Sequence, residues 1–166
     1  MSAQGAAGEA SVKDEGRELR LDLPAAHSAA RMARHLLREF ALREGVPHPE
    51  VESLLLIADE LLSNAVDHGG GDSARDEIEL AEPVRMGLLL VLRDDGWVLE
   101  VSDEGAGDPA VVDQLLHPGG MPDLDDERGR GFFLIAGLCQ SLAVRRRDDG
   151  LGLAITAVRL YAARDS

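Results

Sequence analysis

Polar and hydrophobic residues alternate first at 17–24, where leucines occupy every second position. This alternation predicts a short strand, which Pro24 ends. Over 25–45 the spacing changes, because apolar residues recur every three or four positions, and this predicts a helix that stops at Gly45. The same helical spacing returns over about 50–68, ahead of three consecutive glycines. The first half of the chain is therefore expected to form a strand followed by two helices.

Two hairpins are predicted in the second half. Apolar runs lie on either side of Asp95-Gly96 and again on either side of Asp149-Gly150. An Asp-Gly pair between two strands favours a tight turn, which needs positive φ. Between the hairpins, the sequence PAVVDQLL predicts a short helix and FFLIAGLCQSL an apolar one, with an irregular segment separating them. The charged stretch 72–83 has no clear periodicity and is expected to be a loop.

The order of these elements predicts the fold class. Two antiparallel hairpins argue against a doubly wound parallel sheet and favour helices packed on one face of a sheet. We therefore predict an α+β two-layer sandwich with a mixed, mostly antiparallel sheet and helices on one face. We expect one domain over 17–162, preceded by a disordered tail at 1–16, rich in Gly, Ala, Ser and charged residues, and followed by a short tail at 163–166.

Charge and composition narrow the possible functions. The 166 residues carry a net charge of −14, which disfavours direct nucleic-acid binding because phosphate would be repelled. Such acidity suits a basic protein partner, a ligand whose charge a metal ion masks, or simple solubility. The single cysteine, Cys139, lies in an apolar segment, so we expect a buried, inert thiol in an intracellular, cytoplasmic protein. We expect neither a signal peptide nor a membrane span, since no apolar run approaches roughly 20 residues.

The stretch DELLSNAVDHG, at 59–69, carries the first candidate chemistry. Glu60 and Asn64 are four residues apart, so they lie on one face of the predicted helix, about one turn from each other. A carboxylate and a carboxamide placed this way offer hard oxygen ligands and a possible base. Mg²⁺ is bound through a few such oxygens together with substrate phosphates. The alternative is an ordinary solvated helix face.

Two glycine-containing stretches add to this. Asp103 ends an alternating strand and is followed by Gly105 and Gly107, so its carboxylate can accept a hydrogen bond from an exocyclic amine while the glycines let a flat ring approach. Gly129 and Gly131 precede a predicted helix, whose free N–H groups can bind an anion. The alternatives are an ordinary strand-to-loop turn and an ordinary helix start. Neither a Walker loop nor a complete dinucleotide fingerprint is present.

Together the three stretches have the order and spacing of the N, G1 and G2 boxes of one superfamily. The chain resembles the GHKL (Bergerat-fold) ATPases, and within them the stand-alone anti-sigma factor serine/threonine kinases of bacteria. The resemblance runs from about Arg17 to Tyr161. Four segments carry it: LPAAHSAARMARHLLREF, ADELLSNAVDHG, VLEVSDEGAGDP and RGRGFFLIAGL.

The resemblance implies a role for each motif residue. Asn64 would coordinate an Mg²⁺ ion that bridges the phosphates of ATP or ADP. Glu60 would be the general base that polarises the attacking hydroxyl of a protein serine or threonine. Asp103 would bind the amine of adenine. Residues 108–128 would form the ATP lid, which suits their Pro and Gly content and their lack of periodicity.

The glycines and one threonine complete the implied site. Gly105 and Gly107 would border the adenine pocket and hinge the lid. Gly129 and Gly131 would close the lid and offer backbone N–H groups to phosphate. Thr156, on the last hairpin, would reach adenine through water, although this strand reads LAITAV where the family often has Gly-Thr-Thr.

Three functions follow as hypotheses. By resemblance, the protein is a homodimeric kinase that sequesters a sigma factor of RNA polymerase and phosphorylates a STAS-type anti-anti-sigma partner, which the added charge then releases. The second hypothesis is a non-catalytic module of the same fold, with or without bound nucleotide, that acts only by sequestering a partner. The third is a small α+β domain without a nucleotide site. Replacing Glu60 by glutamine separates the first two, because only the kinase needs its carboxylate.

Overall fold

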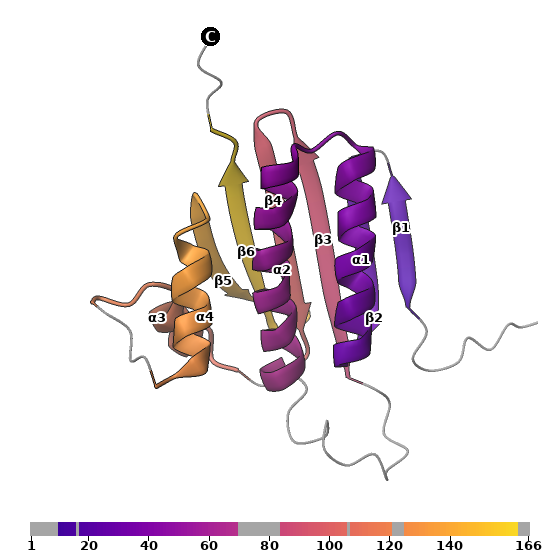
Figure 1. The fold of residues 1–166 in the computed structure, drawn as a ribbon. Coiled ribbons are helices and arrows are strands. Elements are labelled where there is room, and N and C mark those ends of the chain that lie inside the picture. The colour runs from indigo at the N-terminus through magenta and orange to yellow at the C-terminus, as the bar shows by residue number, and fades with distance from the viewer. Residues whose placement is uncertain (1–9, 16, 70–83, 106, 121–124, 163–166) are drawn as a thin grey trace, which may run out of the picture.

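The computed structural model describes residues 10–15, 17–69, 84–105, 107–120 and 125–162. Their helices and strands form two layers, a sheet and a set of helices (Figure 1). The predicted loop at 72–83 lies outside these residues. In chain order the elements are β1 (Ser11–Glu15), β2 (Glu18–Pro24), α1 (His27–Arg43), α2 (His48–Gly69), β3 (Arg85–Arg93), β4 (Gly96–Asp103), α3 (Pro109–Leu116), α4 (Glu127–Ala136), β5 (Ser141–Arg146) and β6 (Leu153–Leu160).

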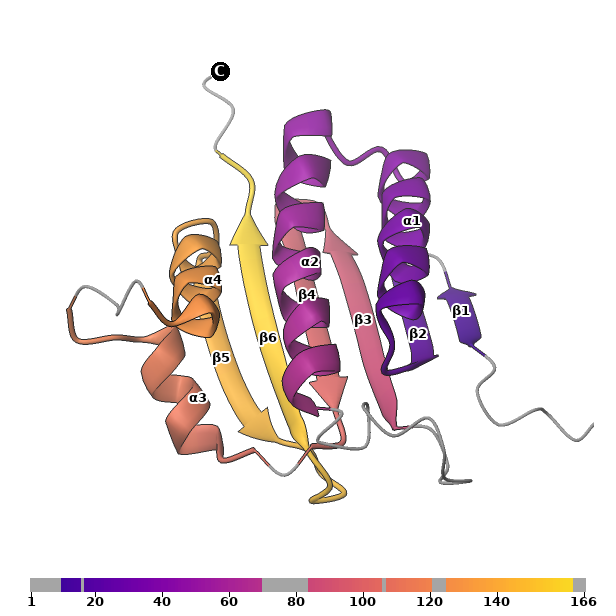
Figure 2. The same ribbon diagram turned by 60° about the horizontal axis from the view of Figure 1, so that its bottom comes forward.

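The strands form a six-stranded sheet in the order β1-β2-β3-β4-β6-β5. Figure 2 shows these strands side by side, with α1, α2 and α4 lying across one face. This arrangement confirms the predicted α+β sandwich with helices on one face. Every strand pairing within the described residues is antiparallel, so the mixed component of the expected sheet is not found there.

The core lies between the sheet and the helices. Strand residues alternate between buried and more exposed positions, because successive side chains point to opposite faces of a sheet. Helix α1 buries residues at the spacing of one helical face. The strand residues that face the helices are mainly leucine: Leu19, Leu21, Leu23, Met86, Leu88, Leu90, Leu92, Leu99 and Val101.

The helices agree with the sequence pattern apart from their ends. Gly45 follows α1 with a φ of 81°, a left-handed conformation that glycine adopts at little cost, and it ends that helix as predicted. Met32 recurs at the helical spacing of the apolar residues in α1, yet it is 40% exposed. Among the described residues, no helix is both long and apolar enough to cross a membrane.

Two local predictions were wrong. Residues 11–15, expected to belong to a disordered tail, form β1, which pairs along its length with β2. The first hairpin turns at Asp94 and Asp95, since Arg93 pairs with Gly96, and Gly96 does not have positive φ. Glycine is needed at position 96 for another reason: a Cβ there would collide with the backbone of Arg159 on β6. The second hairpin, between β5 and β6, is confirmed.

Cys139 is half-buried after α4 and packs against the core. Burial raises the pKa of its thiol to about 11, and the nearby positive charge of Arg159 opposes the shift only partly. At pH 8 its reactive thiolate form should be at least about a hundredfold rarer than that of an ordinary cysteine. We therefore expect iodoacetamide to alkylate the folded protein at least tenfold more slowly than the same protein in urea (roughly, from the thiolate fraction). Equal rates would contradict this environment.

Candidate functional site

Helix α2 carries the first two predicted site residues. The apolar residues that recur at helical spacing in this helix are buried: Leu54, Leu55, Ala58, Leu61, Leu62, Ala65 and Val66. Glu60 and Asn64 lie one turn apart on the side of the helix that faces α4, and both line a cavity there. Asn64 is buried, with 8% of its surface exposed, while Glu60 is half-buried.

The structure separates Glu60 from its acidic neighbour Asp59. The Asp59 carboxylate accepts a hydrogen bond of 3.0 Å from Nε of Arg34 on α1. Glu60 points to the opposite side, toward α4, and no hydrogen-bond donor from the described residues reaches its carboxylate. A carboxylate without a bound donor can accept a proton from a hydroxyl, whereas Asp59 is occupied by an ion pair. Glu60 is therefore the better placed of the two to act as a base.

Gly131 of α4 makes room for the Glu60 carboxylate. A Cβ at position 131 would collide with Oε2 of Glu60 and would lie 3.1 Å from its Cδ. A side chain at position 131 would therefore require the Glu60 carboxylate to move from the position it has in this structure. Gly131 therefore lets α4 approach the Glu60 carboxylate closely.

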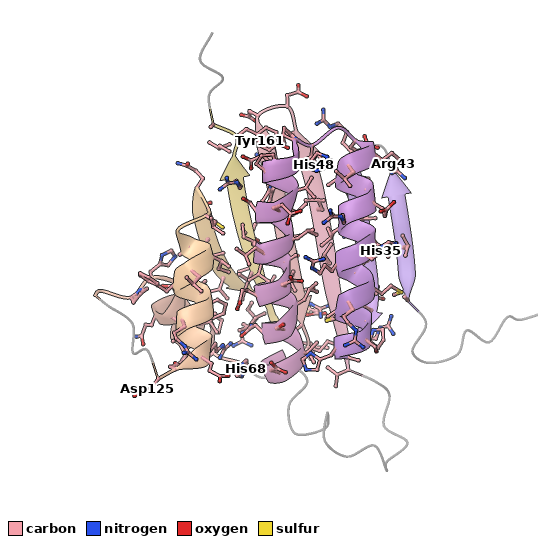
Figure 3. All side chains as sticks on the ribbon, viewed as in Figure 1. His35, Arg43, His48, His68, Asp125 and Tyr161 are labelled. Atoms are coloured by element: carbon pink, nitrogen blue, oxygen red, sulfur yellow. The ribbon has the colours of Figure 1, made fainter. Side chains whose placement is uncertain are left out.

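The cavity between α2 and α4 has a volume of about 460 Å³. Its size lies within the range of small-molecule sites. Figure 3 places His68, one of its lining residues, at the lower end of α2, far from Tyr161 at the opposite end of the fold. The lining residues are Glu60, Ser63, Asn64, Asp67, His68, Glu127, Arg128, Arg130, Gly131, Phe132 and Leu134.

Arg128 crosses this cavity from α4 to α2. Its Nε donates a hydrogen bond of 2.8 Å to Oδ1 of Asn64. Its guanidinium carbon also lies 5.6 Å from the centre of the Phe132 ring, within the range of a cation–π contact. The backbone N–H of Arg128 donates to the side chain of Asp126, which caps the start of α4. Arg128 is thus held at three points.

Asp103 lies at the end of β4 and is buried, with 8% exposure. Its Oδ1 accepts backbone N–H groups from Gly105, at 2.9 Å, and from Leu153, at 3.3 Å. No donor from the described residues binds its other oxygen, Oδ2. Two backbone donors fix the carboxylate, and Oδ2 can accept a further hydrogen bond from a ligand amine.

The β5–β6 hairpin reaches this end of β4. A Cβ at Gly152 would collide with the carbonyl oxygen of Asp103 and would lie 2.9 Å from Cα of Glu104. Gly152 is buried and has a φ of 148°, a conformation that other residues rarely adopt. A Cβ at Gly107 would lie 3.0 Å from a methyl carbon of Leu153. The close approach of the hairpin to Asp103 therefore depends on the absence of a side chain at position 152.

Electrostatics link Asp103 to the cavity, although Asp103 does not line it. Burial lowers the pKa of Arg128, and the negative charges of Asp103 and Asp126 oppose this. Burial also lowers the pKa of His68, helped by the positive charge of Arg128 and opposed by Asp67 and the same two aspartates. His68 is therefore mainly neutral at pH 7, while the Arg128 guanidinium stays charged.

The predicted glycines are only partly where the sequence placed them. Gly105 lies beside Asp103, and Gly107 lies beside Leu153. Gly129 and Gly131 do not precede the helix but lie inside α4, which begins at Glu127. Only the first few N–H groups of a helix are free, so Gly129 can still offer one, whereas that of Gly131 falls within the helical hydrogen-bond ladder.

The structure does not bring Thr156 to the other site residues. Thr156 pairs with Glu100 of β4, and its hydroxyl donates to that carboxylate at 3.1 Å. Glu100 alternates with the buried residues Leu99 and Val101, which face the helices, so Thr156 and Glu100 lie on the opposite face of the sheet. This position contradicts the expected contact with adenine.

Sequence reasoning missed the basic residues of the cavity. Arg128 and Arg130 flank Gly129, and both line the cavity with His68. The sequence did contain a signal for them, because two arginines alternate with the glycines of this motif in a chain whose net charge is −14. The hydrogen bond from Arg128 to Asn64 was not available, because it joins residues 64 positions apart.

The family model described as "Histidine kinase-like ATPase domain" matches residues 23–158. The chain therefore belongs to this family, which confirms the resemblance carried by the sequence motifs. No curated protein matches the chain.

Two solved structures share the fold. One is the crystal structure of the SiaB-SiaC complex from Pseudomonas aeruginosa, with a TM-score of 0.66 and 16% identity, over 86% of this chain and 89% of that one. The other contains the RsbU and RsbW domains of Rv1364c from Mycobacterium tuberculosis, with a TM-score of 0.53 and 18% identity, over 86% of this chain and 31% of that one. At these identities the likeness concerns the fold.

Proposed function

We propose that the protein binds ATP with Mg²⁺ between α2, α4 and the end of β4, and transfers phosphate to a serine or threonine of a partner protein. The family to which the chain belongs supports nucleotide binding. The observation that carries the catalytic part is the placement of Glu60 and Asn64 in one cavity, with Asp103 close enough to influence its charges.

The residues present suit a metal-bound nucleotide. Asn64 Oδ1 is a hard oxygen ligand of the kind that Mg²⁺ accepts, and Asp103 Oδ2 can accept the amine of adenine. Bound Mg²⁺ would neutralise charge on the phosphates. Glu60 would accept the proton of the attacking hydroxyl, which its free carboxylate can do from the cavity wall. Most of the remaining catalysis in phosphoryl transfer is positioning.

The proposed partner is a regulatory protein. One similar chain comes from the structure of a SiaB-SiaC complex, and the other from a structure that contains the RsbU and RsbW domains of Rv1364c. By the motif resemblance we propose a STAS-type anti-anti-sigma protein as the phosphate acceptor and a sigma factor as the sequestered partner. The homodimer stays a prediction.

Phosphate transfer is tested with purified protein, Mg²⁺, ATP labelled on its terminal phosphate, and STAS-domain proteins encoded in the same genome. We expect label on a serine or threonine of one of them. ATP binding without transfer to any would support the second hypothesis, a nucleotide-binding module that acts only by sequestration. The sequence motifs are equally compatible with that module except at Glu60.

Replacing Asp103 by asparagine is expected to weaken ATP binding about 10- to 100-fold, because a hydrogen bond to a charged group is lost. Asparagine can keep the two backbone donors on Oδ1 but places an NH₂ group where Oδ2 would accept the adenine amine. Calorimetric titration with ATP and Mg²⁺ measures the change. Glu104→Gln, at the exposed neighbouring position, is the matched control and should bind normally. Equal affinity of Asp103→Asn and wild type would place adenine elsewhere.

A further inference from the structure

Asn64 has two competing uses. The proposed function assigns its side-chain oxygen to Mg²⁺, yet the same atom accepts the hydrogen bond from Arg128 Nε at 2.8 Å. A guanidinium group and a divalent cation on one amide oxygen would repel each other strongly in a partly buried site. The two cations therefore exclude one another at Oδ1.

The geometry shows that this contact is specific. Asn64 is 8% exposed, so few other donors can reach its oxygen. Arg128 is anchored at its backbone by the Asp126 cap, and its guanidinium carbon lies over the Phe132 ring. Arg130 lines the same cavity but pairs with Glu127 on its own helix, at 4.0 Å. Only Arg128 among the described arginines donates to Asn64.

The surrounding charges favour a cation at this place. Asp103 and Asp126 act on Arg128 with negative charge, and both also act on His68. The Arg128 guanidinium thus places a positive charge at Oδ1 of Asn64, the atom to which the proposed function assigns Mg²⁺. A nucleotide's phosphates would meet that charge whether or not Mg²⁺ accompanies them.

We propose that Arg128 competes with Mg²⁺ for Oδ1 of Asn64 and thereby makes nucleotide binding less dependent on the metal. This inference rests on the proposed nucleotide site. Metal-bound nucleotide must separate Arg128 from Asn64, which weakens binding, whereas metal-free nucleotide keeps the contact and its positive charge. Arg128 is thus a specificity-determining residue that sets the preference between metal-bound and metal-free nucleotide.

The test measures the affinity for ADP by calorimetry with excess Mg²⁺ and with excess EDTA, and takes the ratio of the two dissociation constants. Arg128→Met removes the charge and the donor but keeps an unbranched side chain against Phe132. We expect the metal preference to increase about tenfold in this variant, as for the loss of one competing hydrogen bond. Arg130→Met removes the same charge from the same cavity without touching Asn64, and we expect its ratio to stay near the wild-type value.

The possible results distinguish competition at Asn64 from a purely structural role of Arg128 and from failure of the proposed function. An unchanged ratio in Arg128→Met, or an equal increase in Arg130→Met, would overturn the competition. A purely structural Arg128 would lower the unfolding midpoint without changing the ratio, so thermal unfolding of each variant is measured alongside. Failure of the folded wild type to bind ADP in either buffer would instead overturn the proposed function.

Discussion

Glu60→Gln is expected to lower phosphate transfer to the partner at least about a hundredfold, the usual contribution of a general base. Glutamine keeps the size of the side chain but cannot accept a proton from a hydroxyl. The affinity for ATP should stay within about twofold, because the proposed nucleotide contacts come from Asn64 and Asp103. The measurement combines single-turnover transfer with a calorimetric titration of the same preparation.

Asp59→Asn is the matched control for this variant. It removes the same charge from the adjacent position, where the carboxylate pairs with Arg34 on the far side of α2. We expect its transfer rate to stay within about threefold of wild type, as for a surface ion pair. A large loss in Asp59→Asn with little loss in Glu60→Gln would exchange the assigned roles of the two residues.

Gly152→Ala is expected to destabilise the protein by about 3 kcal/mol, the sum of backbone strain and steric overlap. The new Cβ would collide with the Asp103 carbonyl and would lie 2.7 Å from its carbon, both of them backbone atoms that cannot rotate away. The φ of 148° adds strain for any residue with a side chain. Chemical denaturation measures the change, and ATP affinity should fall with it because Asp103 is displaced.

Gly150→Ala separates backbone strain from steric overlap as causes of the loss of stability. Gly150 lies in the same hairpin with a φ of 75°, but nothing lies within 4 Å of the Cβ that would be added. Its alanine variant should lose only about 1 kcal/mol, from the left-handed backbone conformation alone. Equal losses in the two variants would show that the hairpin does not approach Asp103 as closely as the structure places it.

The sequence predicted the parts of the fold that depend on local periodicity. The spacing of apolar residues in α1 and α2, and the alternation in β2, required no tertiary information. Strand β1 was missed because its residues, SVKDE, are mostly polar, and it forms only by pairing with β2 at the sheet edge. The start of α4 was also missed, since two glycines are unfavourable in a helix unless another group needs the space.

The sequence motifs predicted which residues carry the chemistry of the candidate site, but not the contacts that depend on packing and strand register. Glu60, Asn64 and Asp103 were identified from sequence. The structure places Glu60 and Asn64 in one cavity, and the charge of Asp103 acts on Arg128, which lines the same cavity. The position of Thr156 could not be derived, because the face on which a strand residue lies depends on register between β4 and β6. The contact of Gly131 with Glu60 likewise depends on how α4 packs against α2.

Hydrogen–deuterium exchange with and without ATP and Mg²⁺ tests the central claim most directly, which is that nucleotide binds between α2, α4 and the end of β4. The account predicts slower exchange at 103–105 and 126–131. A second cavity of about 670 Å³, lined by residues within 44–50 and 93–95 near Tyr161, provides the internal comparison and should not change. Protection at that far cavity, with none at the end of β4 or the start of α4, would contradict the account.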